Sequence, residues 1–377
     1  MAAREQRQDR GGTKPRYWGF WTRGKLDLLR KYLDAFTTAS SIKVDERIYL
    51  DLFGGQPENR ERYTGEVLDG SAKIALGTHN PPFTRLRFFE IEPYATRLRE
   101  SLHPSHPGRD LEVIAGDCNS TVHKALASLR RSWWAPTFTF IDPNGPDVHW
   151  STLEALARFK KPTTTKTEIW MLLAAGMFTR TLPVDGQVRV QDAHKLTAMY
   201  GTDHWRTIYD GRVAGELTPG QAREEYVNLM RWRLEQVLGY RTTHPLEIHN
   251  EGGHSIYHMI FATDSDAGDR IMTSLYNRAA NEFPAMRQAA RLRQERLRQE
   301  EAGVQSLFGA DVGLPAAPIR SGERLYQHAP PWPPYERSSR PGQQREPMNW
   351  DPSRVPPANG GQTGITGVND GEQPFPA

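Results

Sequence analysis

The chain has 377 residues, of which 37% are hydrophobic and 25% are charged, and its formal net charge is +3. This length and composition predict one large domain with a substantial core, together with polar segments outside that core. The near balance of charge permits a nucleic acid as a partner without requiring one.

Cysteine content and hydropathy both bear on the compartment. The single cysteine, Cys118, excludes an internal disulfide framework and any zinc site that needs several cysteines of this chain. No stretch approaches the ~18 consecutive apolar residues of a membrane span, and the first residues lack the apolar core of a signal peptide. We therefore expect a soluble, cytoplasmic protein without a membrane partner.

The N-terminal part of the chain divides into an arm and a helix. Residues 1–17 are charged and show no hydrophobic periodicity, which predicts a flexible arm. The main domain should then span residues 18–280. Its first helix is expected at 22–36, where apolar residues recur at three- and four-residue spacing and Lys25 lies outside the apolar stripe.

Five apolar runs predict strands, and most of them precede a helix-like segment. They are residues 47–53, 85–91, 111–117, 137–142 and 168–173. Strands that alternate with helices imply right-handed crossovers and a parallel sheet covered on both faces. Between the first two runs, the polar residues 56–70 indicate a surface loop, followed by a short helix at 72–76.

The pattern changes beyond the fifth run. A helical insert is expected at about 177–238, and the runs 244–249 and 255–263 flank turn-forming residues, which favours an antiparallel hairpin that closes the sheet. A charged helix at 281–302 and a disordered tail at 303–377 should follow. The expected fold is therefore α/β, with a Rossmann-like seven-stranded sheet, a C-terminal antiparallel hairpin and a helical insert.

Four acidic residues stand at the ends of successive predicted strands. They are Asp51, Glu90, Asp117 and Asp142. Ligands of parallel α/β sheets bind at the carboxyl ends of the strands, so these acids are candidates for one ligand site. The alternative is that each acid caps the helix that follows it.

The segment that begins at Asp51 and continues through Phe53, Gly54 and Gly55 resembles motif I of class I S-adenosylmethionine-dependent methyltransferases, whose form is Asp-x-Phe-x-Gly-x-Gly. Glycines allow the backbone to approach a cofactor closely. The resemblance implies a seven-stranded methyltransferase sheet and contacts from these four residues to the methionine part of the cofactor. Pro57 departs from the pattern, since it stands where the motif has its last glycine.

Further cofactor contacts follow from the same resemblance. It implies that Glu90 accepts the ribose hydroxyls, with Ile91 beside it against the adenine. It also implies that Asp117 accepts the adenine amino group and that Cys118 forms the neighbouring wall.

The run Asp142, Pro143, Asn144 and Gly145 resembles motif IV of amino-methyltransferases, and more closely the Asp-Pro-Phe-Gly of tRNA guanine-N2 dimethyltransferases. The likeness implies that Asp142 and Pro143 orient a nitrogen lone pair at the methyl group, so that catalysis is mainly positioning. Asn144 takes the place of the aromatic residue, which makes it the third candidate catalytic position.

A broader resemblance covers roughly residues 20–280. The chain is similar to the three-Cys-motif partner proteins (TcmP family), bacterial proteins typically encoded beside a cysteine-motif protein that looks related to radical-SAM enzymes. The stretches that carry the likeness are Lys25 with Tyr32-Leu33, residues 49–55, 70–76, 89–92, 140–145 and 257–263, and Gly268 with Met272. The family implies a methyltransferase-like fold and a cysteine-motif partner.

Other groups have simpler interpretations. Cys118 is expected to pack in the core because no histidine is paired with it. Four histidines cluster around the predicted hairpin, but His244 and His249 fall on opposite strand faces, so no metal site is expected. The arginines of 287–298 are interleaved with Glu295 and followed by Glu300 and Glu301, which indicates a solvated helix or, alternatively, a surface for RNA or a protein partner.

Two functions remain open from the sequence. One is an S-adenosylmethionine-dependent methyltransferase that acts on an amino nitrogen of an RNA or DNA base. The other is a catalytically inactive, methyltransferase-like protein that binds a cysteine-motif protein or nucleic acid, which the residues Pro57 and Asn144 motivate.

Overall fold

The computed structural model describes residues 17–18, 20–61, 65–104, 106–162, 164–250 and 253–301. The expected arm, except for Tyr17, and the expected tail at 303–377 lie outside these residues. Among the described residues, no helix is long and apolar enough to cross a membrane.

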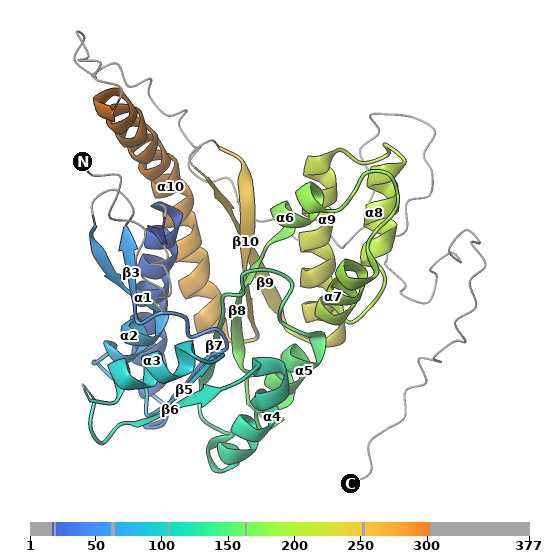
Figure 1. Ribbon diagram of the computed structural model, residues 1–377. Helices are drawn as coiled ribbons and strands as arrows, with labels where there is room; N and C mark the ends of the chain where they lie inside the picture. The colour runs from blue at the N-terminus through green and yellow to red at the C-terminus, as the bar shows by residue number, and fades with distance from the viewer. Residues whose placement is uncertain are drawn as a thin grey trace.

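A seven-stranded sheet runs through the middle of the molecule in the order β6-β5-β2-β7-β8-β10-β9 (Figure 1). Its strands are β2 (Ile48–Asp51), β5 (Arg85–Glu90), β6 (Asp110–Ala115), β7 (Thr137–Ile141), β8 (Glu168–Leu173), β9 (Thr242–His249) and β10 (Ser255–Thr263). The first five of these are parallel, whereas β10 runs antiparallel to both β8 and β9. This strand order, with an antiparallel strand inserted beside β8, confirms the predicted methyltransferase-like sheet and its closing hairpin.

The central strands are apolar because both faces of the sheet are covered. In β2, Ile48 and Leu50 point into one hydrophobic cluster while Tyr49, between them, packs into the other. All three side chains are fully buried. A parallel strand buried on both sides therefore reads as a continuous apolar run, which is why it was recognisable in the sequence.

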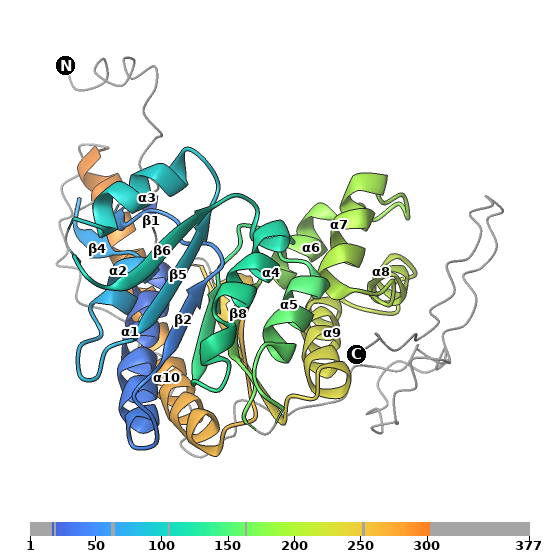
Figure 2. The same ribbon diagram turned by 90° about the horizontal axis from the view of Figure 1, so that it is seen from below.

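Helices form one layer on each side of the sheet (Figure 2). One layer consists of α1 (Phe20–Ser41), α2 (Ser71–Leu76), α3 (Tyr94–Leu102) and α10 (Asp266–Glu301). The other contains α4 (Cys118–Ser128) and α5 (Trp150–Arg158), which the helical insert extends.

The insert follows β8 and forms a helical subdomain beside α5 (Figure 1). It comprises α6 (Ala175–Thr181), α7 (Val190–Tyr200), α8 (Trp205–Val213) and α9 (Pro219–Trp232), with a π-helical turn at Arg233–Val237. These helices confirm that the segment predicted as an insert is helical. Trp205 and Tyr209 of α8 are buried.

The polar segment 56–70 is not the loop that its composition predicts. It contains β3 (Glu58–Glu61) and β4 (Val67–Asp69), which join β1 (Tyr17–Trp18) in a three-stranded sheet. The prediction is wrong because these strands lack apolar alternation: β4 reads Val-Leu-Asp, and both Val67 and Asp69 are exposed. Their pairing depends on the backbone and not on side-chain burial.

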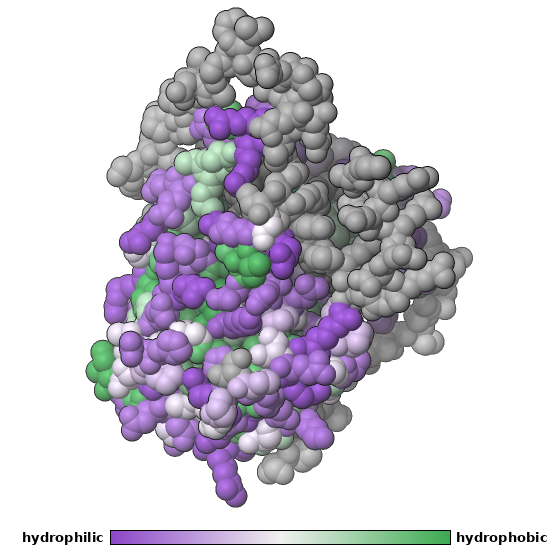
Figure 3. Space-filling view, turned by 60° about the vertical axis from the view of Figure 1, so that its left-hand side comes forward, coloured by the Kyte–Doolittle hydropathy of each residue, from purple (hydrophilic) through white to green (hydrophobic). Residues whose placement is uncertain are grey.

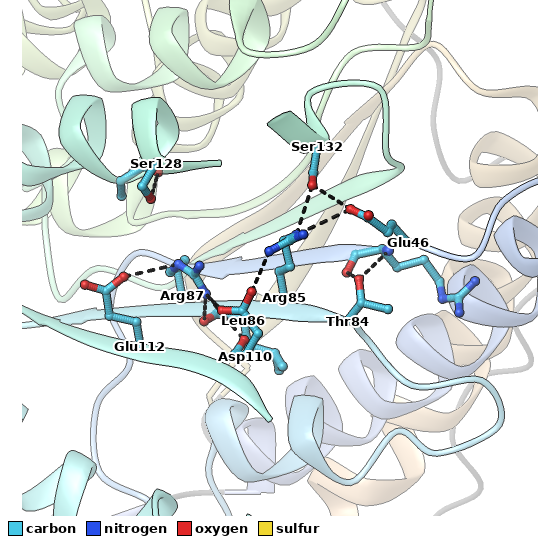
Figure 4. Close-up of polar contacts among 11 residues, drawn as sticks. Glu46, Thr84, Arg85, Leu86, Arg87, Asp110, Glu112, Ser128 and Ser132 are labelled. Atoms are coloured by element: carbon cyan, nitrogen blue, oxygen red, sulfur yellow. Dashed lines mark hydrogen bonds and ion pairs between the residues drawn. The ribbon is translucent and has the colours of Figure 1, made fainter. Parts of the chain in front are cut away.

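The end of the sheet opposite the strand carboxyl ends is tied together by ion pairs (Figure 4). Arg85 of β5 contacts Asp110 of β6 at 2.6 Å and Ser132 at 2.9 Å, while Arg87 contacts Asp110 at 2.8 Å and Glu112 at 3.3 Å. These contacts hold the edge strand β6 in register with β5.

The outer surface of the described chain is mainly polar. Hydrophilic residues predominate on the face in Figure 3, where hydrophobic ones form separate small patches. Among the described residues, large exposed hydrophobic side chains such as Ile42 and Val184 are scattered along the chain.

Candidate functional site

A cavity of about 400 Å³ opens at the carboxyl edge of the sheet. Its wall includes the loop after β2, the turn after β7, the start of α1, the N-terminus of α2 and part of β10. The lining residues used below are Lys25, Phe53, Gly54, Gly55, Asp142, Pro143, Asn144 and Tyr257. Two of the motif segments found in the sequence, which lie far apart along the chain, therefore face one cavity of the size that small ligands occupy.

The loop after β2 approaches β5 closely. The Gly54 N–H donates to the Phe89 carbonyl at 2.8 Å, and a Cβ at Gly54 would lie 2.9 Å from Leu98 Cδ2. Gly55 adopts φ +62° and donates its N–H to Glu90 Oε2 at 2.7 Å. Both glycines are thus required by geometry, one by close packing and the other by left-handed backbone.

Pro57 lies beyond the cavity wall. Its carbonyl accepts the Gly70 N–H at 2.9 Å, and a Cβ at Gly70 would lie 2.3 Å from the Gln56 carbonyl. The chain therefore turns towards the start of α2 at this point. Pro57 does not line the cavity, and Gly54 and Gly55 keep their contacts with β5 despite this departure from the motif.

Asp51 lies behind this loop and does not line the cavity. Its carboxylate is fully buried and accepts the Tyr49 hydroxyl at 3.2 Å and the Phe53 N–H at 3.3 Å. Burial raises the pKa of Asp51 to about 7, although hydrogen bonds from Ser71 and Phe53 lower it. Asp51 thus supports the loop from beneath.

Glu90 and Ile91 stand next to the loop, at the end of β5. One Glu90 oxygen accepts the Gly55 N–H, and the other accepts the Ile91 N–H at 2.9 Å. An ionised carboxylate has about four lone-pair sites, so Glu90 can still accept two hydroxyl groups. The Ile91 side chain is 53% exposed and is available to cover a ring.

Asp117 and Cys118 are not brought to the cavity wall. Asp117 caps α4 by accepting the Asn119 N–H and its side-chain amide, both at 2.9 Å. Burial raises the pKa of Cys118 to about 12, so its thiol stays protonated at neutral pH. The structure therefore shows a capping contact for Asp117 and a core position for Cys118.

Asp142 is paired with a lysine that the sequence did not single out for the site. Lys25 of α1 donates to Asp142 Oδ2, and its side chain is 10% exposed against 25% for Asp142. Pro143 is buried and Asn144 is exposed. The helical pattern placed Lys25 outside the apolar stripe, yet it is buried, because the stripe shows only what faces the core and not what faces a cavity.

Tyr257 of β10 is a second residue of the cavity wall that sequence reasoning missed as a site residue. Its hydroxyl is buried and has no hydrogen-bond partner among the described residues. Burial, and then the charge of Asp142, raise its pKa above the ordinary value. A buried hydroxyl without a partner is costly, so this donor indicates a place for a ligand acceptor.

The residues present fit S-adenosylmethionine. The glycine loop offers close backbone approach, Glu90 has free acceptor capacity for two hydroxyls, and the unpartnered Tyr257 hydroxyl lines the cavity. In the described part of the chain, no group of three or more His, Cys, Asp or Glu side chains could hold a metal ion.

No protein-family model matches the sequence, and no curated protein matches it. Among solved structures, the methyltransferase domain of bacterial CtHen1-C matches at 12% identity and a TM-score of 0.31, covering 63% of this chain and 98% of that one. A protein from Legionella pneumophila, LPL1258, matches at 12% identity and a TM-score of 0.39, covering 68% of this chain and 92% of that one. TYW2 of M. jannaschii, solved in complex with AdoMet, matches at 12% identity and a TM-score of 0.29, covering 64% of this chain and 76% of that one.

Such distant likenesses concern the fold alone. The fold assignment therefore rests on the strand order and directions of the sheet itself.

Proposed function

We propose that the protein is an S-adenosylmethionine-dependent methyltransferase of the TcmP kind that acts on an amino nitrogen of a nucleic acid base. The observation that carries this proposal is that the glycine loop after β2 and the segment from Asp142 to Asn144 line one cavity. In a parallel α/β fold, such an edge is where ligands bind.

Each residue has a stated part in this proposal. Gly54 and Gly55 lie against the methionine portion with Phe53, and Asp51 holds their loop from beneath. Glu90 accepts the ribose hydroxyls.

Adenine lies beyond the ribose in this arrangement. Ile91 covers its ring, and Asp117, with Cys118 as neighbour, is assigned to the adenine amino group. Because Asp117 Oδ1 accepts the capping hydrogen bonds of α4, the proposal assigns its other oxygen to the adenine amino group.

S-adenosylmethionine, when bound, would supply an electrophilic methyl group on a sulfonium, with the sulfur as the leaving group. Asp142 and the Pro143 carbonyl accept hydrogen bonds from the target amine and so aim its lone pair at the methyl carbon; the displaced amine proton passes to water. Lys25 fixes the Asp142 carboxylate in place. Tyr257 donates its free hydroxyl to the base or to the cofactor carboxylate.

Two observations favour the second function, a catalytically inactive protein that binds a cysteine-motif protein or nucleic acid. Lys25 already contacts the Asp142 carboxylate, and the exposed Asn144 provides no aromatic platform for a base. On this alternative, the protein keeps the methyltransferase-like fold and its cavity but does not catalyse methyl transfer.

Methyl transfer distinguishes the two functions. Purified protein is incubated with S-adenosylmethionine that carries a radioactive methyl group and with total RNA or DNA from cells that lack this protein. We expect the label in one of the two nucleic acid fractions. Asp142→Asn should reduce the rate by about 10² or more, because positioning of the amine is lost. Asp147→Asn, which alters an acid beyond the cavity wall in the same turn, is the matched control and should retain activity. Transfer that is unaffected by Asp142→Asn would contradict the assigned role.

A further inference from the structure

A second cavity, of about 660 Å³, lies beside the first one. It is enclosed by α6, α8, α9 and the tip of the β9–β10 hairpin. The described residues that line it include two arginines and two histidines and no carboxylate: Arg212, Arg223, His249 and His254. Its wall therefore carries an excess of positive charge.

A carboxylate beneath the wall holds part of this set in place. Glu247 contacts Arg223 Nε at 3.4 Å and His249 Nε2 at 3.6 Å. A salt-bridged arginine still has several N–H donors to spare, since the guanidinium carries five. Glu247 thus orients Arg223 and His249 without occupying all of their donors.

Arg212 has capacity left for a ligand. Its Nη2 donates to the Thr179 carbonyl at 3.0 Å, which fixes the guanidinium, while its buried Nε has no hydrogen-bond partner among the described residues. A buried N–H without a partner is unfavourable unless a ligand satisfies it. The unsatisfied donor and the two arginines of the wall point to the same kind of occupant, an anion.

The electrostatic surroundings agree with this. Burial lowers the pKa of His249, and the charges of Arg287 and Arg223 lower it further, while Glu247 opposes them. Arg287 belongs to α10, and its guanidinium reaches the tip of the β9–β10 hairpin. A Cβ at Gly253 would lie 3.6 Å from Arg287 Nη1. Cations from two separate parts of the chain thus act on one site.

The two cavities share a partition. On α6, Gly176 lines the second cavity and Met177 lines the first. On β10, Ser255 lines the second cavity and Ile256 lines the first. A Cβ at Gly176 would lie 2.6 Å from the Ser255 carbonyl, so α6 and β10 touch along this partition. A ligand could therefore span both cavities by passing over one strand and one short helix.

We propose that the second cavity binds a phosphate group, and that this phosphate belongs to the backbone of a nucleic acid strand whose neighbouring base enters the first cavity. The assignment of the base rests on the proposed methyltransferase function; the phosphate site does not. Arginines contact phosphate through paired N–H donors, and a phosphodiester next to the reacting base would fix the register of the strand.

The test measures binding of a fluorescein-labelled single-stranded RNA of mixed sequence by anisotropy, together with competition by inorganic phosphate. Arg212→Gln removes the buried donor. His254→Glu places a carboxylate at the cavity mouth. This variant should fold, because His254 is exposed and its backbone N–H and carbonyl bond to Asn250 whatever the side chain. Arg158→Gln on α5, whose side chain is 67% exposed, is the control for loss of one charge elsewhere.

Both cavity variants should lower RNA affinity on the order of tenfold, and the slope of log affinity against log salt should fall by about 0.7 for the lost contact. The control should bind like the wild type. RNA affinity that is equal in the wild type and both cavity variants would overturn the proposal. A variant that loses phosphate competition but keeps RNA affinity would overturn the nucleic acid assignment, since the site would then serve free phosphate.

A separate titration with S-adenosylhomocysteine keeps the two proposals apart. Arg212→Gln should bind S-adenosylhomocysteine like the wild type, because Arg212 does not line the first cavity. Cavity-dependent RNA binding by a protein that does not bind S-adenosylhomocysteine would contradict the methyltransferase proposal and leave the phosphate site standing.

Discussion

Glu168 illustrates how a single enclosed carboxylate links the fold to pH. It begins β8 and is buried, and its two oxygens accept the Tyr32 hydroxyl at 2.6 Å and the Thr263 hydroxyl at 2.8 Å. Burial raises its pKa to about 7, while these hydrogen bonds and the charge of Lys160 lower it. The ionised form is therefore disfavoured in the folded protein near neutral pH.

We expect Glu168→Gln to remove part of the pH dependence of stability. Between the ordinary pKa of 4.5 and the folded value of about 7, the folded state keeps a proton that the unfolded state has released. The free energy of unfolding of the wild type therefore falls as pH rises through this window, by about 1.4 kcal/mol for each unit of pKa difference.

Urea unfolding across the same pH window checks this expectation. Comparing the two proteins isolates Glu168 from other titrating groups, such as His258, whose lowered pKa of about 4 acts in the opposite sense. Equal pH dependence in the wild type and Glu168→Gln would show that Glu168 does not titrate differently in the folded state.

At the scale of elements, Gly201 joins the insert to the main domain. It ends α7 with φ +65°, and a Cβ there would lie 2.4 Å from Cγ of Trp150 on α5. The turn thus needs glycine for two separate reasons, its backbone conformation and its contact with an indole ring. Gly215 has a similar φ of +74° but no heavy atom within 4 Å of such a Cβ.

Gly201→Ala should therefore destabilise the protein more than Gly215→Ala. The left-handed backbone costs about 1 kcal/mol in both variants, and the clash with Trp150 adds about 1–3 kcal/mol in Gly201→Ala alone. Denaturant unfolding measures both values. If the two variants lose the same stability, the contact between α7 and α5 is looser than described.

An element can be predicted from sequence when burial or backbone geometry restricts its residue types locally. The central strands were found because residues such as Tyr49 and Leu50 are buried on opposite faces, which makes the strands continuously apolar. The glycine loop was found because its backbone geometry restricts the residue type at Gly54 and Gly55. Local patterns of this kind are visible in sequence.

The elements that were missed depend on partners far away in the chain. Strand β3 has no apolar alternation and forms by pairing with β1 and β4. Lys25 becomes a site residue only because the fold brings it to Asp142, 117 positions away. The Tyr257 side chain reads as part of an apolar strand, and only the cavity shows that its hydroxyl is a free donor.

At the scale of the whole molecule, the chain concentrates its functional groups along one edge. The strand carboxyl ends and α1 line the first cavity, and the insert and the β9–β10 hairpin line a basic cavity next to it. The helix α10 contributes Arg287 to the same region. The candidate cofactor cavity and the basic cavity share one partition, an arrangement that suits the proposed methyltransferase of a charged polymer.

The most direct test of this account is calorimetric titration of the folded wild-type protein with S-adenosylhomocysteine. We expect saturable heat with one site per chain and micromolar affinity, lost in Glu90→Ala because the ribose acceptor is removed. Glu92→Ala is the control, since Glu92 caps α3 through Thr96 and does not contact the loop. Saturable binding that needs Glu90 but not Glu92 supports the cofactor site. Absence of heat with the folded wild type would contradict it.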